Sequence, residues 1–195
     1  MFEAGKHTKK APATRSKRFF TFVLELAVAV LLAWLITLAV RPTIVLETSM
    51  MPNFEPHDYL FINRLAYNGE LSPARGDVIV FRSDLTTEDG RKKLLIKRVI
   101  GVGGDVIEVR DGQVYVNGIA DDQSYTKDGS TSGSTGPDIV PEGSVYVLGD
   151  NRLVSRDSRD PAIGMVSEDR IVGKVFFRIF HFDRFGKIEN PYEAS

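Results

Sequence analysis

The longest apolar stretch of the chain runs from Phe19 to Val40, with the sequence FFTFVLELAVAVLLAWLITLAV. As a helix that rises 1.5 Å per residue, such a stretch reaches about 33 Å, enough for a hydrocarbon core of about 30 Å. Glu25 is its only charged residue, and an acid at the centre of a span costs on the order of 2.5–3.5 kcal/mol. The surrounding Leu, Val, Ile and Phe residues offset that cost. The pattern therefore predicts one transmembrane helix over residues 19–40.

After residue 40 the apolar positions come in short runs rich in Val, Ile and aromatic residues, separated by Gly, Pro and Asp, as is typical of strands. Asp111-Gly112 lies between two alternating runs, which favours a β-hairpin. We find no helical periodicity in this part and predict a mainly β domain over 41–195, with a smaller β insertion at 105–142 that contains a polar Gly/Ser-rich loop at 125–138. The expected strands span residues 77–81, 94–102, 106–118, 144–149 and 171–180.

The net charge of -1 hides an asymmetry between the two ends of the apolar stretch. Residues 1–18 carry six Lys or Arg and one Glu, whereas residues 41–195 carry 19 basic and 24 acidic residues. By the positive-inside rule, the basic tail at 1–18 predicts a cytoplasmic N-terminus and an extracytoplasmic domain. The domain shows no basic stripe of the kind that binds nucleic acid.

The apolar stretch is longer than the region of about 7–15 residues in a cleaved signal peptide, and it runs into Arg41-Pro42. We therefore expect an uncleaved, single-pass anchor in the cell membrane, with the lipid bilayer as a partner. The absence of cysteine agrees with an extracytoplasmic domain.

The candidate chemical groups are few, because the chain has no cysteine and no HExxH motif that would predict a zinc site. Lys97 stands out: in a strand LLIKRVIGV it shares one face with Leu95 and Val99, while Arg98 points to the other. A lysine with a pKa of roughly 10.4 is neutral in only about one molecule in 2,500 at pH 7, but burial lowers that pKa. A neutral lysine can take the proton of a serine that attacks a carbonyl. Ser49, in TSMMP, is the candidate nucleophile, although a purely structural role stays open for both residues.

Four short stretches occur in a fixed order behind the anchor: SMMP at 49–52, GDVIVF at 76–81, KRVIGVGGD at 97–105 and GDNRLVSRDSR at 149–159. Together they resemble the conserved boxes of bacterial type I signal peptidases (leader peptidases), over about residues 19–181. The resemblance implies a membrane-bound serine endopeptidase with a β-rich catalytic domain and a smaller inserted β domain. Such an enzyme cuts signal peptides from exported preproteins after a small-x-small motif and needs no metal or cofactor.

The resemblance also implies a role for individual residues. Ser49 would be the nucleophile and Lys97 the general base, and Ser155 would hold the lysine amine in place. The site would be braced by Asp157 and Arg159, and its turn would be shaped by Gly149, Asp150 and Asn151. Candidates for shallow apolar pockets that accept the substrate are Val45, Met50 and Leu95. For Met50 a second role, as a filler of the core, stays open.

Three positions depart from the pattern of the family. Asn53 replaces the usual Thr or Ser after the proline of the first box, and Gly103 replaces a proline. Glu47 stands two residues before the nucleophile, where many members carry Ser or Gly and the Ser hydroxyl forms half of the oxyanion hole. We expect Glu47 to point away and to pair with a basic group such as Arg41 or Arg98; the alternative is a protonated acid that donates to the oxyanion.

Two other classes of protein remain compatible with these residues. One is a self-cleaving Ser-Lys protease of the repressor type, against which the anchor and the lack of a DNA-binding unit argue. The other is a catalytically inactive, membrane-anchored β protein that binds exported chains.

Overall fold

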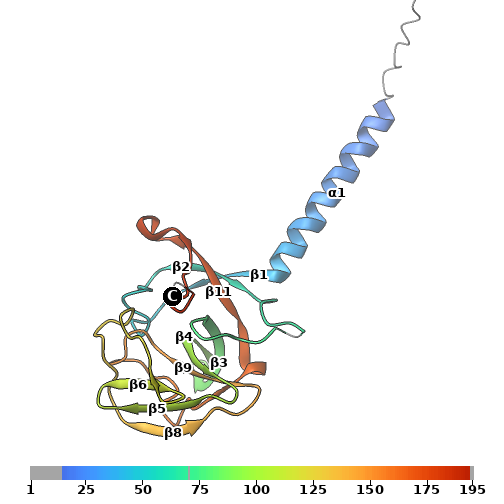
Figure 1. Ribbon diagram of the computed structural model, residues 1–195. Helices are drawn as coiled ribbons and strands as arrows, with labels where there is room; N and C mark the ends of the chain where they lie inside the picture. The colour runs from blue at the N-terminus through green and yellow to red at the C-terminus, as the bar shows by residue number, and fades with distance from the viewer. Residues whose placement is uncertain (1–14, 70, 194–195) are drawn as a thin grey trace, which may run out of the picture. The chain divides into compact units, whose positions relative to one another are not determined.

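The computed structural model describes residues 15–69 and 71–193, so the greater part of the expected basic tail lies outside the described residues. The chain divides into two compact units, Met1–Leu38 and Ala39–Ser195. The helix α1 (Arg15–Ala39) contains a segment, Lys17–Ala39, that is long and apolar enough to cross a membrane (Figure 1). It ends one residue earlier than predicted, because Val40 already pairs with Asn63 as the first residue of a strand.

The second unit is built on an eight-stranded antiparallel sheet in the order β1-β2-β11-β3-β4-β9-β10, with β12 paired to β11. The prediction of a mainly β, antiparallel fold is confirmed. Its strands are β1 (Val40–Ile44), β2 (Tyr59–Asn63), β3 (Val78–Thr86), β4 (Lys92–Val102), β9 (Ser144–Leu148), β10 (Val166–Ser167), β11 (Ile171–Phe180) and β12 (Gly186–Lys187). Two short 3₁₀ helices flank β11: η1 (Glu168–Arg170) and η2 (Phe182–Arg184).

A second sheet of four strands has the order β7-β6-β5-β8 and lies within the range 105–142. It comprises β5 (Val106–Arg110), β6 (Gln113–Val116), β7 (Ile119–Ala120) and β8 (Thr135–Ile139). Asp111 and Gly112 both have positive φ, 52° and 79°, as a two-residue hairpin turn of type I′ requires. In Figure 1 these strands lie on the opposite side of β9 from β1 and β2.

The predicted loop at 125–138 is wrong at its C-terminal end, because Thr135–Ile139 forms β8 and pairs with β5. Its sequence, TGPDI, has the Gly and Pro of a loop, but an edge strand with one partner tolerates a proline. The same reasoning applies to Pro42 in β1, the outermost strand of the main sheet. Sequence analysis also missed β2, a five-residue strand.

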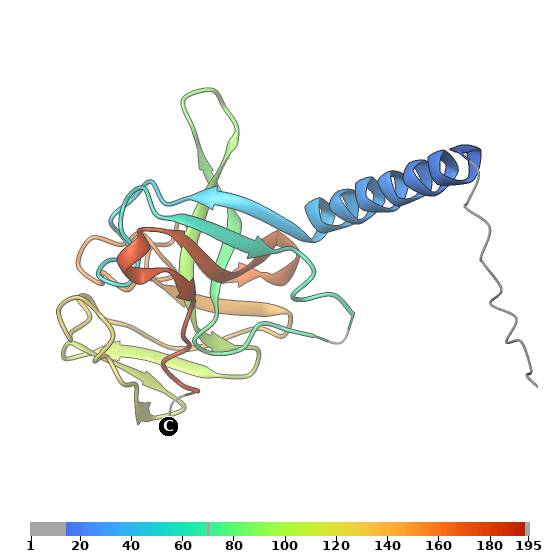
Figure 2. The same cartoon turned by 90° about the horizontal axis from the view of Figure 1, so that it is seen from above.

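The hydrophobic core lies on both faces of β4, the strand that carries Lys97. On one face Leu95 and Val99 belong to a cluster with Ile79, Phe81 and Val147. Ile96 packs against a second cluster that includes Val45 and Met50, and Ile100 belongs to a third, which includes Val109 of the second sheet. Beyond this core, the tip of the β3–β4 hairpin extends away from the rest of the domain (Figure 2).

Candidate active site

Ser49 lies in the turn that follows β1, and this turn is held from two directions. Within the turn, the N–H of Met51 donates to the carbonyl of Thr48 at 3.2 Å. From outside, Asn151 donates its backbone N–H to the Ser49 carbonyl at 3.0 Å and its Nδ2 to the Thr48 carbonyl at 3.1 Å. The position of the serine is thereby tied to the segment 149–151, which is distant in the sequence.

Lys97 extends from β4 to Ser49, with its Nζ 2.7 Å from the Ser49 Oγ. Its Nζ also donates to the carbonyl of Ile96 at 2.9 Å. The lysine is 1% exposed and the serine 5% exposed. Burial lowers the pKa of Lys97 to about 8, although Asp157 and Glu47, among other charges, act in the opposite direction. With that pKa, about one molecule in ten carries a neutral amine at pH 7.

Ser155 lies beside this pair, but its hydroxyl does not form the expected hydrogen bond with Lys97. Its buried Oγ has no hydrogen-bond partner among the described residues, while Lys97 donates to Ser49 and Ile96 instead. A Cβ on Gly149 would lie 2.2 Å from the Ser155 Oγ and 2.4 Å from the Ser49 carbonyl oxygen. A glycine at 149 is therefore what allows the two serines to approach one another.

Asp157 and Arg159 form a buried ion pair beside the turn at Gly149. The carboxylate is inaccessible and accepts from Arg159 Nε and Nη2, both at 2.8 Å. It also accepts the backbone N–H of Gly149 at 3.1 Å. Such two-pronged pairs fix orientation as well as charge, so this pair holds the turn at Gly149 in place.

Asp150 plays a similar part on the other side of the turn. It accepts from Arg98 Nε at 2.9 Å and from Arg98 Nη2 at 2.7 Å. Its Oδ2 accepts from Asn53 Nδ2 at 2.9 Å, and Asn53 Nδ2 donates further to the carbonyl of Tyr125 at 2.8 Å. Asn53, a departure from the family pattern, therefore connects the nucleophile turn to the segments at 125 and 150.

Two cavities border the nucleophile turn and β4. The first, of about 380 Å³, is lined by Ser49, Leu95 and Val154, among others. The second, of about 260 Å³, is lined mostly by apolar residues, including Val45 and Leu95. The structure therefore places two of the three expected pocket residues at cavities.

Of the two roles open for Met50, the structure favours the core, because this side chain is 0% exposed and belongs to the core cluster with Val45 and Phe54. It lines neither of the two cavities. A methionine adapts readily to such a place in the core, because its side chain is unbranched and flexible.

Glu47 forms an ion pair with Lys93. Its Oε1 accepts from Lys93 Nζ on β4, and both side chains are about two-fifths exposed. The prediction that Glu47 pairs with a basic group is therefore confirmed, although the partner is neither of the two arginines that were named as examples. Arg98 is engaged by Asp150 and by the carbonyl of Gly76, whereas Lys93 contacts Glu47.

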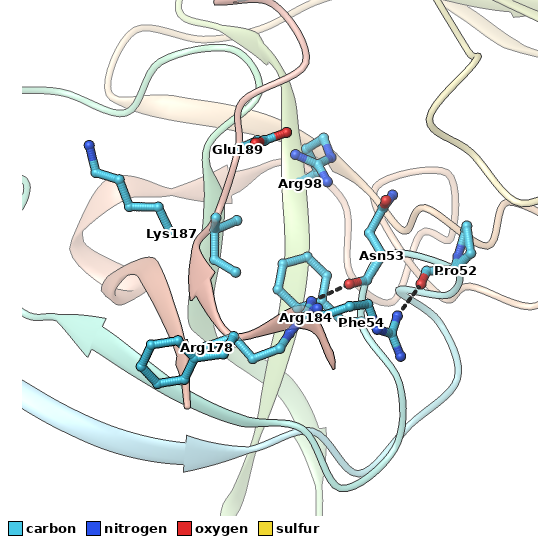
Figure 3. Close-up of a pocket in the computed structure, with 10 residues that line it drawn as sticks. Pro52, Asn53, Phe54, Arg98, Arg178, Arg184, Lys187 and Glu189 are labelled. Carbon is cyan, nitrogen blue, oxygen red and sulfur yellow. Dashed lines mark hydrogen bonds between the residues drawn. The ribbon is translucent and has the colours of Figure 1, made fainter. Parts of the chain in front are cut away.

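A third cavity, of about 390 Å³, is lined by Pro52, Asn53 and Phe54, which follow the nucleophile turn in the chain (Figure 3). There Arg184 Nη1 donates to the carbonyl of Pro52 at 3.1 Å, and Arg178 Nη2 donates to the carbonyl of Asn53. Sequence analysis missed both arginines, although FRIFHFDRF spaces them among aromatic residues. They secure the backbone directly after the nucleophile.

Comparison with known proteins shows the family of the chain. A family model described as "Signal peptidase, peptidase S26" matches residues 18–180. The chain belongs to the signal peptidase family, peptidase S26. It is a serine endopeptidase of that family.

Individual relatives resemble it over most of their length. It is 33% identical to signal peptidase I T of Bacillus subtilis (strain 168) over 192 residues, which cover 93% of this chain and 95% of that protein. It is 40% identical to signal peptidase I of Bacillus caldolyticus over 151 residues, or 70% and 78% of the two chains. A solved signal peptidase I of Enterococcus faecalis V583 aligns with a TM-score of 0.44 at 30% identity, over 53% of this chain and 96% of that one.

Proposed function

We propose that this chain cleaves signal peptides from exported preproteins with Ser49 as nucleophile and Lys97 as general base. The observation that carries the proposal is the contact of 2.7 Å between the Lys97 Nζ and the Ser49 Oγ. The amine is almost fully buried, and its pKa is lowered to about 8. Membership of the signal peptidase family supports the coarser statement that the chain is a serine protease that acts on signal peptides.

The geometry supports a plain acyl-transfer sequence. The Ser49 Oγ attacks the scissile carbonyl carbon while its proton passes to neutral Lys97 Nζ, and the carbonyl oxygen becomes an oxyanion. When the tetrahedral intermediate collapses, the C–N bond breaks, the proton on Lys97 passes to the leaving amine, and an acyl ester remains on Ser49. A water molecule then attacks the ester carbon while Lys97 takes one of its protons. As this second tetrahedral intermediate collapses, the C–O bond to Ser49 breaks, the proton on Lys97 passes to the Ser49 Oγ, and the new carboxyl end is released.

The oxyanion needs donors that are in place before the reaction. The backbone N–H of Ser49 makes no hydrogen bond within the described part of the chain, and it belongs to the residue whose side chain attacks. We assign it as one donor. The hydroxyl that many relatives place two residues earlier is absent here, because that residue is Glu47.

We infer that the two cavities beside Ser49 and Leu95 receive two side chains of the substrate. An extended peptide places alternate side chains on one face, so the residue at the scissile bond and the residue two before it would face the same surface. The cavities border one another, since both are lined by Leu46, Glu47, Lys93 and Leu95. A small-x-small motif fits this spacing.

The helix Lys17–Ala39 is the proposed anchor, with the N-terminal tail in the cytoplasm and residues 41–195 outside. This orientation rests on the basic residues before Phe19. Protease added to the outside of intact cells should digest residues 41–195 and leave the tail intact. Protection of the domain would contradict the orientation.

The activity itself is tested with the full chain in detergent and a purified preprotein whose signal peptide ends in Ala-x-Ala. We expect the wild-type chain to release the mature protein and the Ser49→Ala chain to leave it uncut. If both chains bind the preprotein and neither cuts it, the protein is an anchored binding protein instead.

A further inference from the structure

The ion pair between Glu47 and Lys93 occupies an unusual place for a surface pair. Glu47 precedes the nucleophile by two residues, and Lys93 lies on β4 four residues before Lys97. Both residues line the cavity that holds Ser49 and also the neighbouring apolar cavity. The pair therefore stands on the boundary between the two cavities, directly beside the reacting groups.

A free carboxylate in this place would oppose the reaction in two ways. It would repel the oxyanion that forms during attack, since its negative charge would lie at the lining of the cavity that holds Ser49. It would also favour the charged form of Lys97, which cannot accept a proton. The contact with Lys93 holds the carboxylate in one position, and the ammonium group compensates its charge.

We propose that Lys93 is a positioning residue, which holds the Glu47 carboxylate on the cavity boundary and cancels its charge at the Ser49–Lys97 pair. This inference rests on the proposed function. The pair adds little to stability, because exposed ion pairs contribute little; its effect falls on the reaction. Glu47 and Lys93 act on the pKa of Lys97 in opposite directions, the carboxylate raising it and the ammonium lowering it.

The other charges around these groups are already accounted for in the structure. On the Lys97 side, Asp157 is paired with Arg159 and Asp150 with Arg98. On the Glu47 side, Arg156 also lines the cavity, but its Nε contacts Asp160 at 2.8 Å. Several ion pairs form within the described residues, 15–69 and 71–193. Among them, only the pair of Glu47 and Lys93 has both members in the lining of the cavity that holds Ser49.

The test is a double-mutant cycle on full-length protein in detergent, with the Ala-x-Ala preprotein as substrate. We expect Glu47→Ala to change kcat by less than about threefold and Lys93→Ala to lower it by about tenfold, a fraction of the 10²–10³ that one oxyanion donor contributes. The double variant Glu47→Ala/Lys93→Ala should recover to within about threefold of wild type, because the harmful carboxylate is gone. Lys93→Arg should stay near wild type, since it keeps the charge.

The pH profile of kcat/KM tests the electrostatic role of Lys93, because the loss of a residue with a purely structural role would leave this profile unchanged. The acid limb of this profile reports the pKa of Lys97 in the free enzyme, which is about 8 in the wild type. It should move up by about half a pH unit in Lys93→Ala, down by a similar amount in Glu47→Ala, and return in the double variant. High salt should shrink the defect of Lys93→Ala, because exposed charges are screened.

Lys92→Ala is the matched control, because Lys92 is the adjacent residue of β4 and forms an exposed pair with Asp84 at 3.2 Å. It should leave both kcat and the acid limb unchanged. A double variant as impaired as Lys93→Ala, with no movement of the limb, would overturn the inference. If the wild type fails to cut, or Ser49→Ala still cuts, it is instead the proposed function that fails.

Discussion

Lys97 and Arg98 are neighbours on β4, both almost fully buried, yet their surroundings are opposite. Arg98 faces Asp150 and forms two hydrogen bonds with it, which raise its pKa although burial alone would lower it. Lys97 faces a hydroxyl and a carbonyl, and burial lowers its pKa to about 8. A buried cation thus keeps its charge where a carboxylate contacts it and becomes a base where none does. The alternation of the strand separates the two environments.

The strongest test of this difference replaces Lys97 with a residue that stays charged. Lys97→Arg keeps a cation but cannot lose its proton near neutral pH. We expect it to be as inactive as Lys97→Ala, with kcat reduced by at least about 10³-fold. Retention of more than a few per cent of wild-type turnover would show that Lys97 is not the base.

On the other face, removal of Arg98 should destabilise the protein. Arg98→Met leaves the buried Asp150 carboxylate without a partner, and breaking a buried pair in this way costs about 3–5 kcal/mol. Thermal unfolding of the full chain in detergent should show a clear fall in Tm. The double variant Arg98→Met/Asp150→Asn should regain part of the loss; no recovery would mean that the pair acts through packing alone.

Lys97→Met should have the opposite effect on stability. The folded pKa of Lys97, about 8, lies below its ordinary value of 10.5, so below pH 8 the buried amine opposes folding by about 3 kcal/mol. The unfolded chain binds more protons between pH 8 and 10.5, and wild-type stability should therefore rise with pH through that window. Lys97→Met should have the higher Tm at pH 7, with an advantage that fades towards pH 10.5. An advantage that does not depend on pH would contradict the lowered pKa.

The smallest expected effect concerns Ser155. Its Oγ has no partner within the described residues, and Ser155→Ala leaves both reacting groups in place and alters only the packing beside Gly149 and the nucleophile turn. We expect kcat to fall by about tenfold, with little change in Tm. A loss as large as that of Lys97→Ala would mean that Ser155 takes part in proton transfer.

Much of the site could be predicted because its parts are local. The four boxes keep their order in the chain, and the two-residue period of LLIKRVIGV is enough to place Lys97 and Arg98 on opposite faces. The apolar length of residues 19–40 likewise predicts a helix from composition alone. These features depend on residue type and spacing, which are properties of the sequence itself.

Tertiary structure decided which groups meet across the sheet. The partner of Glu47 is Lys93 because β4 passes beside the turn at 47–49, and no local pattern favours it over Arg41 or Arg98. Met50 belongs to the core because Val45 and Phe54 converge on it. Each contact joins segments that are separated by loops, and its partner is selected by how the strands pack rather than by the neighbouring residues in the chain.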